Sequence, residues 1–351
     1  MFSKDELKQY NRHLILEKIG KEGQLKLKSS KVIVIGAGGL GCPILQYLTA
    51  AGVGTIGIID YDVVNQSNLQ RQILYTFDDI GKPKAESAMK RLSRLNPFIK
   101  FNVYNERLTN KNILSIFENY DIIIDGSDNF PTRYMINDAV VLLNKPLVYG
   151  AIFKFEGQVS VFNYKGAATY RCLYPKPPKI QESPNCSEIG VLGVLPGIIG
   201  SFQANEVIKI ICEMGEVLTN KLLILDVLNM RQILLKFERT KNTKLISLEK
   251  DYENFCGLKN MENEISLDEL ENNREKYNLL DVREDWERKE SHIGGQHISL
   301  LDLPIRYKEI TPEKPLVVYC KSGKRSRTAI SILKDKKIKG LKLLNLKGGV
   351  N

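Results

Sequence analysis

The sequence lacks a long hydrophobic run. Its first residues, Met1–Glu6, contain no apolar core of the kind that a secretory signal needs. The longest apolar stretch, Ile189–Phe202, is interrupted by four glycines and by Pro196, so it does not have the pattern of a membrane-spanning helix. We therefore predict a cytoplasmic protein that has no membrane partner.

Cysteine is also scarce, with six residues scattered along a chain of 351. Such spacing favours a reducing compartment over a disulfide framework. The formal charge of +10 could attract nucleic acid, but the positive residues do not form a tract, and we expect no nucleic-acid partner. With 43% hydrophobic and 26% charged residues, the composition is that of an ordinary globular chain with room for two domains.

The segment 31–60 carries the pattern of a nucleotide-binding unit, and a helical pattern at residues 5–27 precedes it. A β-branched apolar run at Val32–Ile35 leads into the glycine turn Gly36–Gly41, and a helical pattern follows from Cys42. A phosphate bound at such a turn must touch backbone N–H groups at the start of the helix. A β-carbon at Gly36, Gly38 or Gly41 would hold the phosphate away, which explains why glycine is needed there.

A second apolar run, Thr55–Ile59, ends at Asp60, nineteen residues after Gly41. A carboxylate at this position can accept hydrogen bonds from a ribose. Taken alone, this glycine pattern favours a nicotinamide or flavin cofactor, and a tight turn in any α/β protein remains an alternative.

Polar residues after Asp60 are unusual for a dehydrogenase. They crowd the expected phosphate side, and a lysine opens the next helix, where its charge and the helix dipole both attract an anion. A buried strand predicted at Asp121–Asp125 then exits into a loop that carries an acid and an arginine, Arg133, at the carboxyl edge of the sheet. The polar and charged residues expected at this site are Asp62, Asn68, Arg71, Gln72, Lys84, Asp128 and Asn129.

In order along the chain, six motifs resemble those of the ThiF/MoeB adenylyltransferases, prokaryotic relatives of ubiquitin-activating enzymes. Such enzymes use MgATP to adenylate the C-terminal Gly-Gly carboxylate of a small ubiquitin-like sulfur carrier protein, releasing pyrophosphate. The resemblance implies a Rossmann-like, doubly wound α/β adenylation domain over about residues 4–256. The motifs are Tyr10–His13, Gly36–Gly41, Asp60 with Asp62, Ser67–Gln72, Gly81 with Lys84, and Asp128 with Asn129.

The resemblance also implies a role for each site residue. Asp128 would be the magnesium ligand, and Arg12 looks like an arginine finger that reaches into the partner subunit's site, which implies a homodimer. The alternative for Arg12 is a solvated charge on a helix. Arg12, Arg71, Lys84 and Asp128 would form the catalytic set. The residues implied in ATP binding are Gly36, Gly38, Gly39, Gly41, Asp60, Asp62, Asn68, Arg71, Gln72, Lys84, Asp128 and Asn129.

Relatives of this family carry two Cys-x-x-Cys pairs that together hold a structural zinc ion. This chain keeps half of each pair, because Thr169 precedes Cys172 and Glu253 precedes Cys256 at the positions of the missing thiols. We therefore expect the zinc site to be lost, with Cys172 and Cys256 as its remnant.

Three other cysteines have separate assignments. Cys186 matches the position where family members carry an acyl or disulfide link to the carrier, and a bystander role is its alternative. A thiol before a helix in a basic protein can have a lowered pKa, which supports the functional assignment. Cys42 and Cys212 fall within apolar helical patterns, so we predict that both pack in the core.

Beyond a polar linker, the segment Ile265–Leu270 predicts the start of a helix. A second chemical motif appears near the end of the chain. Leu316–Tyr319 predicts a strand, and Cys320 follows it at once. The next loop leads into a helix from Ser326, which should place the sulfur near backbone N–H groups at a helix N-terminus. Positive charge in the loop, favouring a thiolate or persulfide, comes from Lys321, Lys324 and Arg325.

This segment resembles a rhodanese sulfurtransferase domain. A tyrosine-phosphatase loop needs arginine six positions after its cysteine, whereas Arg325 is five positions after Cys320, so sulfur fits better than phosphate. Two departures stand out. The segment Gly295–Ser299 lacks the expected proline, and the chain stops at Gly348–Asn351, where relatives continue into a closing helix. We expect a small domain of marginal stability, and whether it is active stays open.

We predict a ThiF/MoeB-like domain at residues 1–250, a linker at 251–262 and a rhodanese-like domain at 263–351. ATP would activate the carrier's terminal glycine, a persulfide on Cys320 loaded from thiosulfate or another persulfide donor would attack the acyl-adenylate, and Cys186 is the candidate for releasing the thiocarboxylate. The sequence leaves the pathway open between molybdopterin, thiamine, another sulfur metabolite and tRNA thiolation. Alternatives are an adenylyltransferase with a non-catalytic rhodanese docking domain, an NAD-dependent dehydrogenase, and a scaffold that binds ATP and the carrier without turnover.

Overall fold

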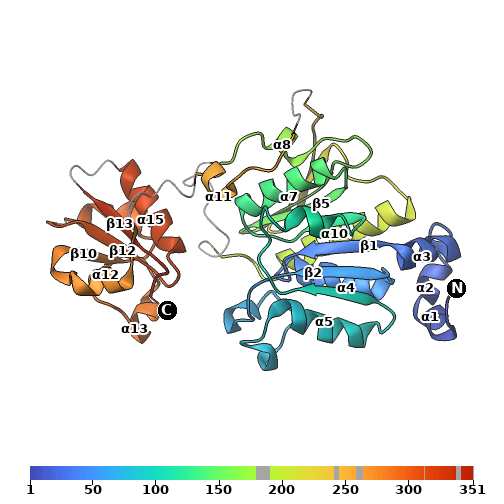
Figure 1. The fold of residues 1–351 in the computed structure, drawn as a ribbon, viewed down its shortest axis with the longest axis horizontal. Helices are drawn as coiled ribbons and strands as arrows, with labels where there is room; N and C mark the ends of the chain where they lie inside the picture. Colours follow the sequence, from blue (N-terminus) through green and yellow to red (C-terminus); the bar gives the residue numbers. More distant parts are fainter. Residues whose placement is uncertain (179–189, 241–244, 258–263, 312, 337–340, 351) are drawn as a thin grey trace. The chain divides into compact units, whose positions relative to one another are not determined.

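The computed structural model describes residues 1–178, 190–240, 245–257, 264–311, 313–336 and 341–350. These residues form two compact units, which we describe separately (Figure 1). Met1–Pro177 and Gly190–Tyr252 make up the first unit, and the second contains the chain from Glu253 onward. In this described part of the chain, no helix combines the length and the apolarity that crossing a membrane would require.

An eight-stranded sheet is the centre of the first unit. Its strands are β1 (Lys31–Ile35), β2 (Thr55–Ile59), β3 (Lys100–Tyr104), β4 (Ile122–Asp125), β5 (Leu147–Phe153), β6 (Glu156–Phe162), β7 (Lys221–Asp226) and β8 (Arg231–Lys236). They are arranged in the order β3-β2-β1-β4-β5-β6-β7-β8, parallel from β3 to β5 and antiparallel from β5 to β8. The chain runs outward from β1 to β3 and then returns to β4 on the other side of β1. This reversal is the topological switch point, where doubly wound sheets bind ligands beyond the carboxyl ends of their strands.

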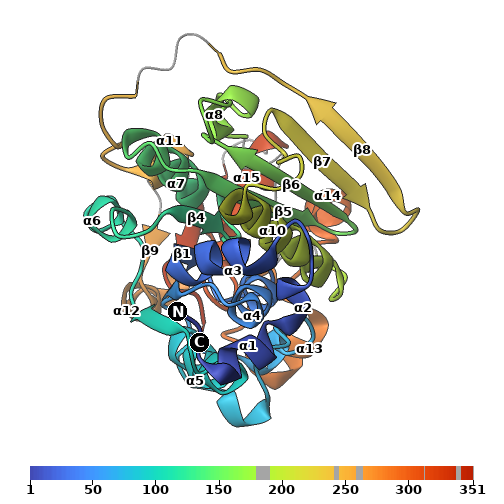
Figure 2. The ribbon, with the colours of Figure 1, turned by 90° about the vertical axis from the view of Figure 1, so that its right-hand side faces the viewer.

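Helices cover both faces of this sheet. One face carries α3 (Gly20–Ser29), α4 (Gly41–Ala51), α5 (Lys84–Leu95) and α10 (Leu195–Cys212), of which α3 and α4 both pack against α10 (Figure 2). On the other face, α7 (Phe130–Leu142) packs on β4 and contacts α6 (Ile113–Phe117) and α8 (Tyr170–Leu173). Two short 3-10 helices, η1 (Gln66–Asn68) and η2 (Phe77–Asp79), lie between β2 and α5 in the chain.

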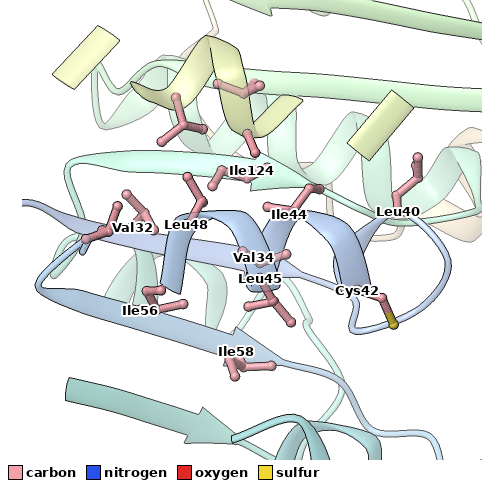
Figure 3. Packing of buried hydrophobic residues seen from close by; sticks show 14 of the residues in the cluster. Val32, Val34, Leu40, Cys42, Ile44, Leu45, Leu48, Ile56, Ile58 and Ile124 are labelled. Carbon is pink, nitrogen blue, oxygen red and sulfur yellow. The ribbon is translucent and has the colours of Figure 1, made fainter. Parts of the chain in front are cut away.

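The hydrophobic core explains why β1 has no polar residue after Lys31. Successive side chains of a strand point to opposite faces, and in a parallel sheet both faces are covered by helices. Val32 and Val34 pack with Leu45 and Leu48 of α4, as the close view in Figure 3 shows. Helix α4 ends at Ala51, and the next residue, Gly52, has a φ of +89°, the left-handed conformation that terminates helices. The strand, turn and helix predicted for this segment are thus confirmed.

The N-terminal segment differs from its sequence pattern. Residues 5–27 suggest one helical element, whereas the structure has α1 (Lys4–Gln9), α2 (Asn11–Leu14) and α3. Ser3 caps α1 by accepting a hydrogen bond from the Glu6 N–H. The break before α3 ends at Gly20, with a φ of +55°, a conformation that a helix interior does not contain.

The second unit contains a smaller, wholly parallel sheet. Its strands are β9 (Glu264–Ile265), β10 (Asn278–Asp281), β11 (Gln296–His297), β12 (Leu316–Tyr319) and β13 (Leu343–Leu346), in the order β11-β10-β12-β13-β9. Apolar clusters cover both faces of β12, whose four residues are all buried. The helices are α12 (Leu267–Asn272), α13 (Asp285–Glu290), α14 (Leu303–Arg306) and α15 (Lys324–Asp335), with the 3-10 helices η4 (Arg274–Lys276) and η5 (Tyr307–Glu309). Helix α11 (Tyr252–Phe255) lies where the two units meet in the chain.

One boundary in this unit was wrong. The sequence pattern starts a helix at Ile265, but this residue belongs to β9, and α12 begins after Ser266. Ser266 caps the helix by accepting a hydrogen bond from the Glu269 N–H at 3.2 Å. A two-residue edge strand is too short to leave a periodic signal in the sequence.

Candidate functional site

In the glycine turn after β1, packing requires glycine at several positions but not at Gly38. A β-carbon at Gly41 would lie 2.0 Å from the carbonyl oxygen of Gly36, and one at Gly36 would lie 2.9 Å from that of Gly126. A β-carbon at Gly39 would press on Pro196 at 3.1 Å. At Gly38, however, the nearest atom would be 3.6 Å away, which is ordinary contact. Packing therefore does not demand glycine at 38, which leaves the close approach of a ligand to the backbone as a reason for glycine there.

Asp60, at the carboxyl end of β2, ties this turn together. One carboxylate oxygen accepts a hydrogen bond from the Ala37 N–H at 2.8 Å, and the other accepts one from the Asp62 N–H at the same distance. Burial raises the pKa of Asp60, although nearby Lys84 opposes the shift. Each carboxylate oxygen can accept a second hydrogen bond, so Asp60 can still receive hydroxyl groups from a ribose.

Positive side chains border the turn. Lys84 is the first residue of α5 and is almost fully buried, and its ammonium group pairs with Asp62 at 3.2 Å. The Arg71 guanidinium donates to the Ser67 carbonyl at 3.2 Å, and the side-chain oxygen of Asn68 caps η1 by accepting from the Asn65 N–H. The carboxylate of Asp62 therefore balances the positive charge of Lys84 in this structure. The sequence pattern had assigned Lys84 to the phosphates.

Asp128 lies in the loop that leaves β4, at the same sheet edge as the glycine turn. Its side chain is exposed, and one oxygen accepts a hydrogen bond from the Asn129 amide at 3.3 Å. Asn129 itself caps α7 by accepting from the Thr132 N–H. A solvent-facing carboxylate at this sheet edge fits Mg²⁺, which is commonly held by one or two carboxylates together with substrate phosphates.

Sequence reasoning missed the buried polar residues beneath this loop. Asp125 ends β4 with one oxygen accepting from the Ser127 N–H at 2.8 Å, while its other oxygen has no hydrogen-bond partner among the described residues. Burial raises the pKa of Asp125, although Arg133 acts in the opposite sense. Gln203 of α10 donates to the Asp125 carbonyl at 2.7 Å. A carboxylate ending an otherwise apolar strand and a glutamine within an apolar helix were the available signals.

The cysteines of the first unit separate into core and surface. Cys42 and Cys212 both belong to the hydrophobic core, as predicted, and burial raises the pKa of Cys42 to about 12. The Cys172 sulfur accepts hydrogen bonds from the N–H groups of Thr169 and Thr240, at 3.4 and 3.5 Å. Partial burial works against ionisation of Cys172, but hydrogen bonds with the side chains of Thr169 and Thr240, together with those from their N–H groups, bring its pKa below the usual value.

Four further calls concern the implied zinc site, Cys256, Cys186 and Arg12. Among the residues that the structure covers, no group of three or more His, Cys, Asp or Glu side chains could hold a metal ion. Cys256 is buried in the second unit. Cys186 lies outside the described residues, so its expected role stays a prediction. Arg12 lies on α2 with an exposed side chain.

The second candidate site surrounds Cys320, the residue that follows β12. The cysteine is fully buried, and its sulfur accepts a hydrogen bond from the Ser326 N–H at 3.4 Å, in the first turn of α15. The Cys320 carbonyl accepts from the Val350 N–H at 2.9 Å, and Gly349 packs so closely on this loop that a β-carbon there would lie 2.3 Å from the same carbonyl oxygen. The predicted approach of a helix N-terminus to the sulfur is present, through the backbone of Ser326.

The loop arginine is not a free positive charge. Arg325 forms a two-pronged ion pair with Glu287 of α13, with nitrogen to oxygen distances of 2.5 and 2.6 Å. Burial disfavours ionised Glu287, but the hydrogen bonds from Arg325 prevail and lower its pKa. Sequence spacing gave no sign of this pair, because 38 residues separate its members.

Comparison with known proteins gives two domain matches. The ThiF family matches residues 10–247, and the rhodanese-like domain matches residues 266–351. Solved structures of Escherichia coli MccB share the fold: its complex with MccA-N7isoASN gives a TM-score of 0.61 at 22% identity, over 68% of this chain and 74% of that one. This likeness concerns the fold alone.

Two curated relatives are more similar in sequence. A "Sulfur carrier protein adenylyltransferase" of Thermus thermophilus is 48% identical over 269 residues, which cover 74% of this chain and 99% of the relative. A "Probable adenylyltransferase/sulfurtransferase MoeZ" of Mycobacterium tuberculosis is 41% identical over 351 residues, covering 95% of this chain and 89% of the relative. These findings confirm the predicted family and fold class: the chain belongs to the ThiF family and carries a C-terminal rhodanese-like domain.

Proposed function

We propose that the protein adenylates the C-terminal glycine of a ubiquitin-like sulfur carrier with ATP, and then transfers sulfur to it from Cys320 to form a thiocarboxylate. The observation that carries the first half is the arrangement at the switch point, where Gly38, a glycine that packing does not require, the carboxylate of Asp60 and the exposed carboxylate of Asp128 share one sheet edge. The names of the two curated relatives support both halves.

The chemistry of adenylation fits this inventory. A carrier carboxylate is already a nucleophile, so no general base is needed: its oxygen bonds to the α-phosphorus, and the bond to the pyrophosphate oxygen breaks with its electron pair. What the protein must supply is orientation and compensation of negative charge. Backbone N–H groups of the glycine turn, together with Arg71 and Lys84, would hold the phosphates, while Asp60 would orient the ribose. Magnesium, with Asp128 as its protein ligand, would neutralise phosphate charge.

Sulfur transfer would use the second unit. The outer sulfur of a persulfide on Cys320 bonds to the acyl carbon, and AMP leaves. Cys186 then attacks the Cys320 sulfur, which forms a disulfide and releases the thiocarboxylate, and an external dithiol reduces the disulfide. Thiosulfate or another persulfide donor would reload Cys320. Tethering both units in one chain keeps the nucleophile at high effective concentration near its target.

We also propose the assembly and the domain limits. Residues 1–250 would form the adenylation domain, 251–262 the linker and 263–351 the sulfurtransferase. The protein would be a cytoplasmic homodimer in which Arg12 reaches the nucleotide site of the partner subunit. Its exposed position on the short helix α2 is compatible with such a contact.

A carrier-dependent exchange of ATP with labelled pyrophosphate tests the adenylation step. Asp128→Ala should abolish exchange without changing the circular dichroism spectrum, because removal of the carboxylate strips charge compensation worth several kcal/mol from the leaving group. Asp78→Ala is the matched control, since Asp78 is an exposed acid of η2. Full exchange by Asp128→Ala would refute the assignment.

One observation favours a second candidate for the C-terminal half. Cys320 has no exposed surface in this structure, as would suit a rhodanese-like domain that only docks the carrier. Cys320→Ala decides between the candidates. For active transfer, pyrophosphate exchange should stay within about three-fold of wild type, while thiosulfate-dependent thiocarboxylate formation should fall by orders of magnitude, because alanine cannot hold a sulfane sulfur. Undiminished thiocarboxylate formation would favour the docking role.

A further inference from the structure

A chain of polar groups runs beneath the sulfur of Cys320. The Ser326 hydroxyl oxygen lies 3.5 Å from this sulfur and, at 2.6 Å, donates its proton to the side-chain oxygen of Asn345 on β13. Cys320, Ser326 and Asn345 are all 0% exposed. The chain therefore connects three side chains that are wholly removed from solvent.

The outer end of this chain of polar groups, at Glu264, fixes the direction of its hydrogen bonds. The Asn345 amide nitrogen donates to the Glu264 carboxylate at 3.2 Å, and Arg327 also binds this carboxylate, at 2.9 Å. A carboxylate only accepts, so the amide nitrogen of Asn345 faces Glu264 and its oxygen must face Ser326. Ser326 has one proton, which goes to Asn345, and its lone pairs therefore face Cys320. In this arrangement the Cys320 thiol donates to Ser326.

Packing alone does not explain these residues. The other members of β13, Leu343, Leu344 and Leu346, are buried and apolar, whereas Asn345 places an amide in the same strand. Burying an amide and a hydroxyl costs free energy unless each is hydrogen-bonded, and apolar residues would fill the space without that requirement. The hydrogen-bonded polar groups end at the sulfur of Cys320, so we expect their role to be an interaction with this sulfur.

We propose that Ser326 is a positioning residue for the sulfur chemistry of Cys320, with a hydroxyl that turns between Asn345 and the sulfur. With the neutral thiol it donates to Asn345. When the sulfur carries negative charge, the hydroxyl turns and donates to it, beside the N–H of the same residue. A hydrogen bond to a charged acceptor is about twice as strong as a neutral one, so the charge itself drives the turn. This inference rests on the proposed role of Cys320 as a sulfur carrier.

Two half-reactions place charge on this sulfur. In loading, the Cys320 thiolate bonds to the outer sulfur of thiosulfate, and sulfite leaves with the electron pair of the broken S–S bond. In discharge to cyanide, carbon bonds to the outer sulfur, thiocyanate departs, and the electron pair returns to Cys320 as thiolate. Discharge therefore requires hydrogen-bond donors to the Cys320 sulfur in the transition state, where negative charge develops on this sulfur. Loading requires the same donors in the ground state, where the thiolate is already charged.

The test measures both half-reactions in the full-length protein. Loading is followed by mass spectrometry of the peptide that contains Cys320, and discharge by thiocyanate formation after excess thiosulfate is removed. Ser326→Ala should slow discharge about 10-fold or more, in line with the loss of a hydrogen bond to a charged group. Ser326→Thr, which keeps the hydroxyl, should stay within about three-fold of wild type. Ser331→Ala, which removes another buried hydroxyl from α15, is the matched control and should leave discharge unchanged.

Asn345→Ala supplies an independent measurement. It removes the group that competes for the hydroxyl, so discharge should be at least as fast as in wild type, although the buried amide is lost. A rate as low as that of Ser326→Ala would overturn the proposed turning of the hydroxyl. Discharge at the wild-type rate by Ser326→Ala, or equal slowing by Ser326→Thr and Ser326→Ala at unchanged melting temperature, would overturn the role of Ser326. If Cys320→Ala still produces thiocyanate, the proposed sulfurtransferase activity fails instead.

Discussion

The glycine turn after β1 allows a prediction that separates folding from nucleotide binding. Gly41→Ala would place a β-carbon 2.0 Å from a backbone oxygen, and this overlap can be relieved only by moving the turn. Overpacking of this kind costs about 1–3 kcal/mol or more. For a domain of this size, 1 kcal/mol corresponds to about 2–4 °C in melting temperature, so Gly41→Ala should lower it by about 2–12 °C.

Gly38→Ala should behave in the opposite way. Its β-carbon would lie 3.6 Å from the nearest atom, so the free energy of unfolding should change by less than about 0.5 kcal/mol. The same β-carbon would stand between the backbone N–H groups and a bound phosphate. Loss of one hydrogen bond to a charged group corresponds to about 1.5–3 kcal/mol, which is about 10- to 150-fold in ATP affinity.

The assay pairs thermal unfolding with calorimetric titration of ATP for wild type, Gly38→Ala and Gly41→Ala. Gly38→Ala should have the wild-type melting temperature and weak ATP binding, whereas Gly41→Ala should lose thermal stability. Wild-type ATP affinity in Gly38→Ala would refute the reasoning, because it would show that no phosphate approaches the backbone at this glycine. A melting temperature lowered as much as that of Gly41→Ala would refute the claim that packing leaves this position open.

Three further outcomes follow from the structure. If Arg12 completes the site of the partner subunit, mixing inactive Arg12→Ala with inactive Asp128→Ala should restore up to about a quarter of wild-type exchange sites, since a hybrid dimer contains one intact site. Glu287→Gln should lower the stability of the second unit by about 1–3 kcal/mol at pH 7. The pKa of Glu287 is lowered in the folded state, so its contribution to the free energy of unfolding is present above the usual glutamate pKa of 4.5 and is lost as the pH falls below that value. Urea unfolding at several pH values, followed by the fluorescence of the single tryptophan, Trp286 of α13, measures this loss. Purified protein should contain well under one zinc per chain, and a chelator should not lower its melting temperature; stoichiometric zinc would show that Thr169 and Glu253 do not abolish the site.

Local sequence was enough to predict much of the fold, because the signals lay within short stretches. Strand β1, the glycine turn and α4 follow one another without interruption, and the apolar run Ile122–Ile124 of β4 indicates burial on both faces. Prediction failed at Ile265 and in the N-terminal segment, where short elements and a left-handed glycine interrupt the pattern. Helical periodicity cannot show a break that depends on where the chain must next pack.

The sequence by itself determined the family, because six short motifs occur in a fixed order along the chain. It also determined the glycine turn after β1 and the loop that follows Cys320, because each is formed by consecutive residues. Tertiary structure alone decided which polar groups meet. Gln203 reaches Asp125 across 78 residues, and Asn345 reaches Glu264 across 81. Such partners share no local pattern, since parallel strands bring distant segments together only after the helices between them have packed. For the same reason, the buried hydrogen bonds beneath Cys320 became visible only in the folded chain.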